Sequence, residues 1–404
     1  MTQNRRDGIL EYLASTRYVR RLNVRKDLAE FTKSTIEWML STASAESLSR
    51  IDFVLLNSIQ ADCEILVSKA KSTIVADLSV FEFIMEINAR CKSAEPEEGR
   101  PYWEATALGH ASLCAEQHLP AMFCANLRRQ ARSAAETYLS SMDNFTEEFR
   151  IQILLVLLHE VYHALMHTPE FRTLALSNWS VIKRLLLMRL DKALTPREDV
   201  LGLLMPKLGL SRERLVGNME DSRMVAASWI EQHSEEIICD YYAFDALTNM
   251  LPDSDPGLIM LYFDTALRAL ELRKLINGVG QNLWSSTLQE ESAGVIFRDP
   301  RLGARALLCY PIAWVALAVR GARLDEDRLI AKMTRFPVVR DRFATNVLSI
   351  REAFRLAFPV PVKQSIGLPW FDEHVRKLTL EMFDCAKVDG GDEECLCWIG
   401  KHGN

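Results

Sequence analysis

The stretch Leu154–His167 reads LLVLLHEVYHALMH and places three histidines and one glutamate in an otherwise apolar run. The preceding letters, IQILLVLL, are apolar nearly all round a helix, which predicts a helix buried in the interior. Asn144 and Glu147 fit a capping box before this run, and Pro169 follows it. We therefore expect one buried helix over about residues 145–168 and a protein built around it.

His159 and His163 are four residues apart in this helix. At about 3.6 residues per turn they share one face with a rise of roughly 6 Å, so both imidazoles can reach one metal ion. Glu160 is offset by about 100° and is expected to act as general base and not as a ligand. The alternative is a metal-free buried histidine pair, but burying Glu160 beside it without a cation would be costly.

His167 follows four residues later and is not equivalent to the other two histidines. Relative to His159 it lies about 80° around the helix and roughly 12 Å along its axis, which excludes a shared ion. A histidine at a helix end is favoured by the macrodipole. We expect this ordinary role, with an auxiliary role beside the metal ligands as the alternative.

A third ligand is expected from SWIEQHSEEIICDYYAFDALTNML, which begins at Ser228. The pattern predicts a helix that carries Glu236 and Asp240 on one face, together with His233. A catalytic zinc site takes three protein ligands, so we assign Glu236 to the metal. Asp240 would accept a proton from the imidazole of His159 and fix its tautomer.

Several alternatives stay open in this segment. Glu235 and His233 compete with Glu236 for the ligand role, and a solvated acidic face without metal is the plain alternative for the whole segment. An oxyanion could be stabilised by any of four nearby polar groups, and the sequence does not choose among them. These groups are Tyr241, Tyr242, His233 and Arg223.

The two motifs HEVYH and EEIICDYYA together resemble the gluzincin metallopeptidases, whose second helix reads Glu-x-x-Ala/Cys-Asp-x-x-Ala. Soluble phage-encoded and phage-exclusion peptidases are the nearest comparison, because this chain lacks the spanning helices of the membrane-embedded members. The resemblance implies a zincin-like core and a zinc ion. It assigns the ligand role to His159, His163 and Glu236, the general base to Glu160, and the supporting carboxylate to Asp240.

A further segment, RDPRLGARALL, matches the family only in part. Pro300 and Arg305 stand at the spacing of a His-Pro-x-x-x-x-Arg segment, with Asp299 where the histidine would be. This departure leaves the role of the segment open.

The fold is expected to be mainly α, of the α+β class, with a small sheet and added helices at both ends. Glycine is scarce (17 of 404), and helical spacing is clear from Ser180 and from Gly257 onward. Residues 72–77 predict a strand, residues 78–92 a helix, and residues 52–68 further strands. In the family, the strand at 72–77 can form the edge that pairs with an extended peptide.

We divide the chain into an N-terminal helical region (1–50), a zincin-like metallopeptidase domain (51–310) and a C-terminal helical region with an irregular tail (311–404). The tail contains Cys385, Cys395, Cys397 and His402. These side chains could bind a second, structural zinc ion, but ordinary tail cysteines are the favoured interpretation because the spacing is not a familiar one.

Composition limits the classes of binding partner and the cellular compartment that we expect for this protein. The net charge is −6 without a long run of either sign, which gives no support for nucleic-acid binding. Nine scattered cysteines and no secretory apolar region indicate a reducing cytoplasm. The most apolar later run, residues 306–319, is shorter than the ~20 residues that span a bilayer, so a buried helix and no membrane span are expected.

These observations predict a cytoplasmic, zinc-dependent endopeptidase, in which the metal polarises the scissile carbonyl and Glu160 takes a proton from water. Its substrate would be an intracellular protein, in phage defence or stress regulation, with a regulatory partner bound through the N- or C-terminal region. The alternatives are a catalytically silent binding protein with the same fold and a zinc hydrolase of a non-peptide substrate.

Overall fold

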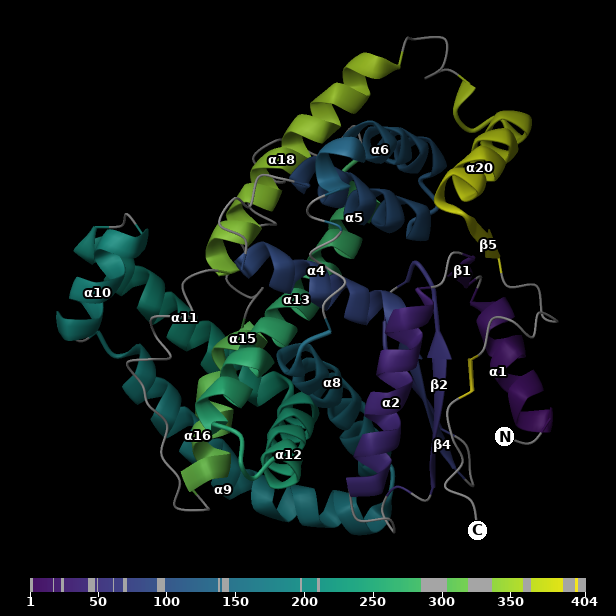
Figure 1. Ribbon diagram of the computed structural model, residues 1–404. Helices are drawn as coiled ribbons and strands as arrows, with labels where there is room; N and C mark the ends of the chain where they lie inside the picture. The colour runs from purple at the N-terminus through teal and green to yellow at the C-terminus, as the bar shows by residue number, and fades with distance from the viewer. Residues whose placement is uncertain are drawn as a thin grey trace.

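The computed structural model shows a mainly helical protein with two small sheets (Figure 1). The residues that it describes are 3–16, 18–22, 25–42, 48, 50–60, 62–67, 71–92, 99–136, 139, 145–196, 198–208, 211–284, 304–318, 336–358, 365–387 and 397–398.

The helices come in three groups along the chain. The N-terminal helices are α1 (Gln3–Ser15), α2 (Lys26–Thr42), α4 (Leu78–Lys92), α5 (Arg100–Cys114), α6 (His118–Ala131) and the short 3-10 helix η1 (Ser133–Ala135). The central ones are α8 (Glu147–Met166), α9 (Pro169–Leu194), α10 (Glu198–Leu208), α11 (Arg212–Gln232), α12 (Ser234–Met250) and α13 (Pro256–Asn282). The last ones are α15 (Ala304–Leu307), α16 (Cys309–Ala318), α18 (Phe336–Ala357) and α20 (Pro369–Phe383).

The larger sheet has four strands in the order β3-β4-β2-β6. Its strands are β2 (Ile51–Leu56), β3 (Glu64–Val67), β4 (Ser72–Asp77) and β6 (Cys397–Trp398). β4 runs parallel to β2 and antiparallel to β3. The strand and helix expected over residues 72–92 are thus confirmed, but the strand is interior and the half-exposed β3 is at the edge.

The ends of the chain meet in the sheets. β1 (Val19–Arg21) pairs antiparallel with β5 (Cys385–Lys387), and β6 pairs with β2 in the larger sheet. Contacts therefore cross both of the predicted domain boundaries. The three-part division of the chain stays a prediction.

Helix α8 lies in the middle of the fold, between α2, α12 and α13 (Figure 1). Among the described helices it is the one long and apolar enough to cross a membrane, yet 72% of its apolar window is buried inside the protein. It thus serves as a core helix. Helix α16 is likewise buried, as expected for the second apolar run.

The start of α8 differs from the expectation. Thr146 is the N-cap, because its Oγ1 accepts a hydrogen bond from the backbone N–H of Phe149 at 3.3 Å. Glu147 is the first helical residue, and Asn144, the predicted cap, lies outside the described residues. Threonine at this position satisfies one of the free N–H groups of the first turn.

A buried amide pair joins α8 to α4. Asn88 Nδ2 donates to Gln152 Oε1 at 2.5 Å, and Gln152 Nε2 donates to Asn88 Oδ1 at 3.1 Å. Gln152 precedes His159 by seven residues, about 20° short of two full turns, so both side chains lie on one face. The contact with α4 is therefore on the same face of α8 as His159.

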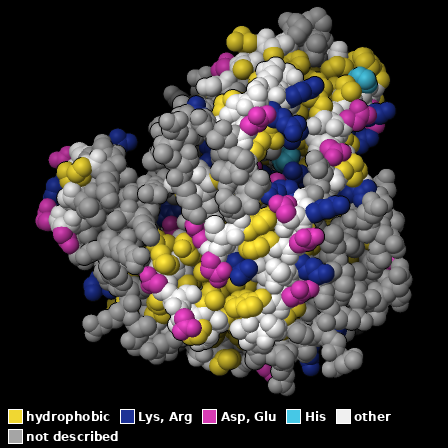
Figure 2. All heavy atoms as spheres, in the orientation of Figure 1, with side chains coloured by type: hydrophobic (Ala, Val, Ile, Leu, Met, Phe, Trp, Pro, Cys, Tyr) yellow, Lys and Arg dark blue, Asp and Glu magenta, His cyan; other side chains and the backbone are white. Residues whose placement is uncertain are grey.

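The surface on the face shown in Figure 2 mixes acidic and basic side chains, and a hollow opens over α5.

Candidate metal centre

The adjoining helices α8 and α12 bring His159, His163 and Glu236 together. The two histidine Nε2 atoms are 3.0 Å apart, and they lie 3.5 Å and 3.3 Å from the carboxylate oxygens of Glu236. Donors arranged tetrahedrally at Zn–N lengths of about 2.0–2.1 Å are themselves about 3.3 Å apart. The three side chains could therefore hold one metal ion.

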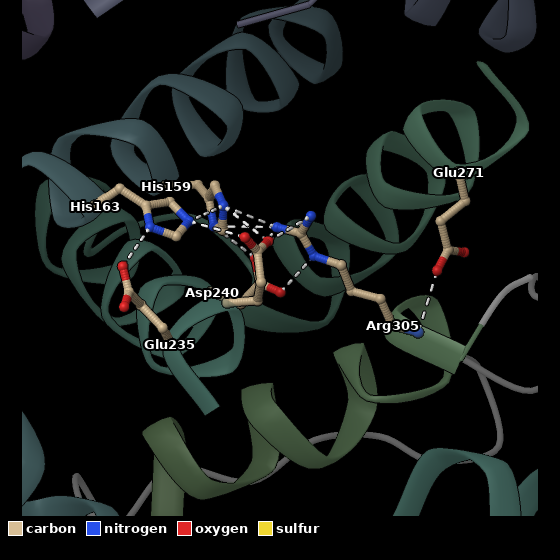
Figure 3. Close-up of polar contacts among 7 residues, drawn as sticks. His159, His163, Glu235, Asp240, Glu271 and Arg305 are labelled. Atoms are coloured by element: carbon tan, nitrogen blue, oxygen red, sulfur yellow. Dashed lines mark hydrogen bonds and ion pairs between the residues drawn. The ribbon is translucent and has the colours of Figure 1, made fainter. Parts of the chain in front are cut away.

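The opposite nitrogen of each ring contacts a carboxylate from α12 (Figure 3). His159 Nδ1 lies 2.9 Å from Asp240 Oδ1, and His163 Nδ1 lies 3.3 Å from Glu235 Oε1. An N–H donated at Nδ1 leaves the lone pair of Nε2 for a metal. Asp240 thus has its expected contact, and Glu235, an alternative ligand by sequence, contacts the far nitrogen of His163.

The first turn of α12 explains why acidic side chains gather here. Glu235 and Glu236 follow Ser234 directly, at the helix N-terminus. Carboxylates are stabilised there by the partial positive charge of the free backbone N–H groups. The local sequence thus places two negative charges opposite the histidines of α8.

Arg305, from α15, completes the centre. Its Nε and Nη2 donate to the two oxygens of Asp240 at 2.8 Å and 2.7 Å, and its Nη1 lies 3.2 Å from Glu236 Oε2. Its backbone N–H donates to Glu271 Oε1 at 3.1 Å. The partial motif therefore located a residue of the site, while Pro300 and Asp299 lie outside the described residues.

The guanidinium of Arg305 lies over the ring of His159. Its Nη2 is 3.1 Å from both Nδ1 and Nε2 of that ring. An atom equidistant from both ring nitrogens at this range must sit above the ring face, because the Cε1–H group blocks an approach in the plane. The in-plane lone pair of His159 Nε2 is thus not the acceptor of Arg305.

The electrostatic balance of the centre favours a cation. Its carboxyl groups are Asp62, Glu160, Glu235, Glu236 and Asp240, and its cations are Arg305 and Lys274. Burial and Arg305 lower the pKa of His159, but Asp240 and Glu236 outweigh them and raise it to about 8. Despite burial, the histidines and Arg305 hold the pKa of Glu236 below its ordinary value. A site that draws a proton onto a buried imidazole suits a divalent metal.

Glu160 lines the same pocket, which has a volume of about 220 Å³. Burial raises the pKa of its carboxyl group, and the nearby histidines act in the opposite direction. Among the described residues its carboxylate has no hydrogen-bond or ion-pair partner. It is thus available to a water molecule or a substrate in the pocket.

One wall of the pocket is apolar, and another comes from the segment before β3. The apolar side chains are Leu155 and Val156 of α8 with Phe263, Leu267 and Leu270 of α13. Asp62 and Cys63 also line it, directly before the edge strand β3. The pocket therefore lies between a hydrophobic surface and the two residues that lead into β3.

His233 does not lie on the helix of Glu236, contrary to the expectation. α11 ends at Gln232 and α12 begins at Ser234, with His233 between them at φ −125° and ψ 46°. Its ring stacks on Trp229 at 3.6 Å. His233 is not among the three residues that could hold a metal ion, and it does not line the pocket.

The other auxiliary candidates also lie outside the pocket lining. Tyr241 is buried in the main core, and the hydroxyl of Tyr242 accepts a hydrogen bond from an amide on α9 at 3.3 Å. Arg223 is exposed and pairs with Asp191 at 2.6 Å. His167 is the exposed C-cap of α8. The cations that do line the pocket are Arg305 and Lys274.

The second zinc site stays a prediction. Cys385 is buried in β5, and its Sγ donates to Phe383 O at 3.3 Å. Cys397 lies in β6, in the other sheet, while Cys395 and His402 lie outside the described residues.

Two residues of the centre carried no recognisable signal in the sequence. Glu271 and Lys274 belong to the long helix α13 and reach the site only through packing against α8 and α15. Helical spacing predicted the helix α13 but not which of its faces contacts the candidate site.

Comparison with known proteins found no family model, no curated protein and no solved structure that matches the chain.

Proposed function

We propose that the protein is a zinc-dependent endopeptidase of the gluzincin type with a zincin-like core. One observation carries this proposal. The side-chain atoms of His159, His163 and Glu236 that could bind a metal lie together in one pocket. The same pocket holds the carboxylate of Glu160, which has no hydrogen-bond or ion-pair partner among the described residues.

The donor set supports zinc as the metal. Two imidazoles and one carboxylate are typical ligands of catalytic zinc, which keeps a fourth position open. A bound zinc ion would supply Lewis acidity and an acidified water molecule. Asp240 and Glu235 would hold the two imidazoles in the tautomer that presents Nε2, and Arg305 would keep Asp240 in place.

Glu160 would move the proton. Its carboxylate would accept a proton from the attacking water and deliver it to the leaving amine nitrogen, so that water is added across the C–N bond. A partly buried carboxyl group with a raised pKa is better matched to this exchange near neutral pH than an exposed one.

A peptide in extended form suits the surroundings of the pocket. β3 pairs with β4 on one side, and no described strand pairs with its other side. An edge strand can bind a peptide by adding it to the sheet. The apolar wall formed by Phe263, Leu267 and Leu270 would receive a hydrophobic side chain of that peptide.

The biological setting is proposed from the sequence alone. It comprises an intracellular protein as substrate, a cytoplasmic location, a role in phage defence or stress regulation, and a regulatory partner at the N- or C-terminal region.

The test is cleavage of cell-lysate proteins by the zinc-loaded full chain, read out as new N-termini that disappear with a chelator. Glu160→Gln should retain zinc and lower the cleavage rate by about 10²- to 10⁴-fold. His167→Gln is the matched control, because this exposed histidine lies about two turns beyond Glu160, at the end of the same helix, and it should retain both zinc and activity.

Undiminished cleavage by Glu160→Gln would overturn the mechanism. Stoichiometric zinc without any chelator-sensitive cleavage would favour the alternative of a catalytically silent binding protein. Turnover of a small ester or amide without protein cleavage would favour the hydrolase of a non-peptide substrate.

A further inference from the structure

A second cavity, of about 430 Å³, lies apart from the metal pocket and is rich in arginine. Four arginines from different parts of the chain line it: Arg21 in β1, Arg25 before α2, Arg128 in α6 and Arg273 in α13. Helices α4 and α5 supply the remaining walls. Figure 2 shows a hollow over α5 with basic and acidic side chains at its rim and a histidine inside.

All four arginines have contacts within the protein, and Arg25 is paired with Asp27 at 2.6 Å. Arg21 forms an ion pair with Glu82, Arg128 Nη2 donates to Met382 O at 3.0 Å, and Arg273 Nη2 donates to Ile59 O at 2.9 Å. A guanidinium carries five N–H donors, so each retains donors beyond these bonds. The Nε of Arg273 is buried and has no acceptor among the described residues.

His110 lies in the same cavity with an unsatisfied polar atom. The residue is 5% exposed, its ring contacts Phe383 at 5.0 Å, and its buried Nε2 has no hydrogen-bond partner among the described residues. Burial, followed by Arg21, Arg273 and Arg128, lowers the pKa of this ring well below its ordinary value. Burial and the three arginines together thus favour the neutral form of this histidine.

The acidic residues of the cavity do not cancel this charge. Glu82 is paired with Arg21. Burial and then Glu82 raise the pKa of Glu86 to about 8, so this side chain is largely protonated at neutral pH. Arg273 is buried, and a buried positive charge is costly unless an anion offsets it.

We propose that this cavity binds a small phosphorylated molecule, whose phosphoryl group is held by Arg21, Arg128 and Arg273 with His110 as a further partner. Arginine is suited to phosphate because its planar N–H groups match the phosphate oxygens. Phe83 and Tyr102 offer contact surface for the organic part, and the volume falls in the range of small-molecule pockets. Glu82 and Glu86 can accept hydrogen bonds from its hydroxyl or amino groups.

This proposal does not depend on the proposed peptidase activity. The two pockets share no lining residue, and a protein without zinc should still bind the anion. Binding is therefore measured directly, by calorimetry on the full chain with AMP, glucose 6-phosphate and inorganic phosphate. Adenosine serves as the unphosphorylated control.

We expect saturable binding, one molecule per chain, of at least one phosphorylated probe, and none of adenosine. Thr106→Phe should abolish it by filling the cavity without removing a charge, and Arg128→Gln should weaken it by about tenfold or more. Arg355→Gln, at an exposed arginine far along the chain in α18, should bind as the wild type does.

Absence of saturable binding of all three probes by the folded wild type would overturn the proposal, and so would unchanged binding by Thr106→Phe. Circular dichroism establishes that each variant is folded. If Arg128→Gln fails to fold, the titrations of the wild type and of Thr106→Phe still test whether the cavity binds the phosphorylated probes.

Discussion

Asp240 and Arg305 are 65 residues apart and form a buried two-point ion pair, with Nε–Oδ2 at 2.8 Å and Nη2–Oδ1 at 2.7 Å. The same carboxylate contacts Nδ1 of His159 at 2.9 Å. One side chain therefore connects α8, α12 and α15. The orientation of the candidate metal ligand His159 consequently depends on a segment that follows the motif helices in the chain.

Asp240→Asn should weaken both zinc binding and the fold. It leaves the buried guanidinium of Arg305 without its main counter-charge, which costs about 3–5 kcal/mol. It also removes the carboxylate behind His159, which should lower zinc affinity by about 10- to 100-fold. Urea unfolding and competition with a zinc chelator measure the two effects.

The control is Asp264→Asn, which breaks the buried pair with Arg268 (2.8 Å) within α13. It should lower stability and leave zinc affinity unchanged. If both variants lost zinc equally, the contact of Asp240 with His159 would have no specific role.

Two adjacent carboxylates should respond differently to the same substitution. Glu236→Gln removes a ligand and should abolish tight zinc binding, whereas Glu235→Gln removes only the exposed contact with His163 Nδ1 and should cost about tenfold or less. Zinc stoichiometry after gel filtration distinguishes them. Equal loss of zinc in both variants would indicate that Glu235 is also a ligand.

Zinc should stabilise the folded protein. Free zinc at about 100 times its dissociation constant adds about 2.7 kcal/mol if it binds only the folded state. Thermal unfolding with zinc and with a chelator measures this difference. His163→Ala should show no such shift, while His167→Ala should keep it in full.

Stability should vary with pH through Glu86. Its pKa is raised to about 8 in the folded protein, above the ~4.3 of an unfolded chain, so its contribution is present below about pH 4 and is lost as the pH rises toward 8. Glu86→Gln has no carboxyl group to ionise at this position, so it does not lose this stability as the pH rises. Relative to the wild type, the variant should gain on the order of 1 kcal/mol between pH 5.5 and pH 8, a figure reduced for partial exposure.

Urea unfolding at the two pH values checks this prediction. Glu352→Gln, at an exposed position of α18, is the control and should show the same difference from the wild type at both. A Glu86→Gln variant that behaved like this control would show that burial does not perturb Glu86.

Much of the local structure was predictable because helices and strands leave periodic patterns. The strand and helix over residues 72–92 and the core helix α8 follow from such patterns. The interruption between α11 and α12 at His233 was not predicted, because no glycine or proline marks it in the sequence. The acidic pair after Ser234 was the available signal, because carboxylates favour the first turn of a helix.

The sequence by itself determined the chemistry of each motif helix: the spacing of His159 and His163 on one face, and that of Glu236 and Asp240 on another. Helical periodicity acts within a few residues, so these relationships need no knowledge of the rest of the chain. Only the tertiary structure decided that Glu236 faces the histidines while Glu235 contacts the far side of one, that β3 forms the sheet edge, and that Arg305 closes the site. These depend on packing between elements distant in sequence, which periodicity does not encode.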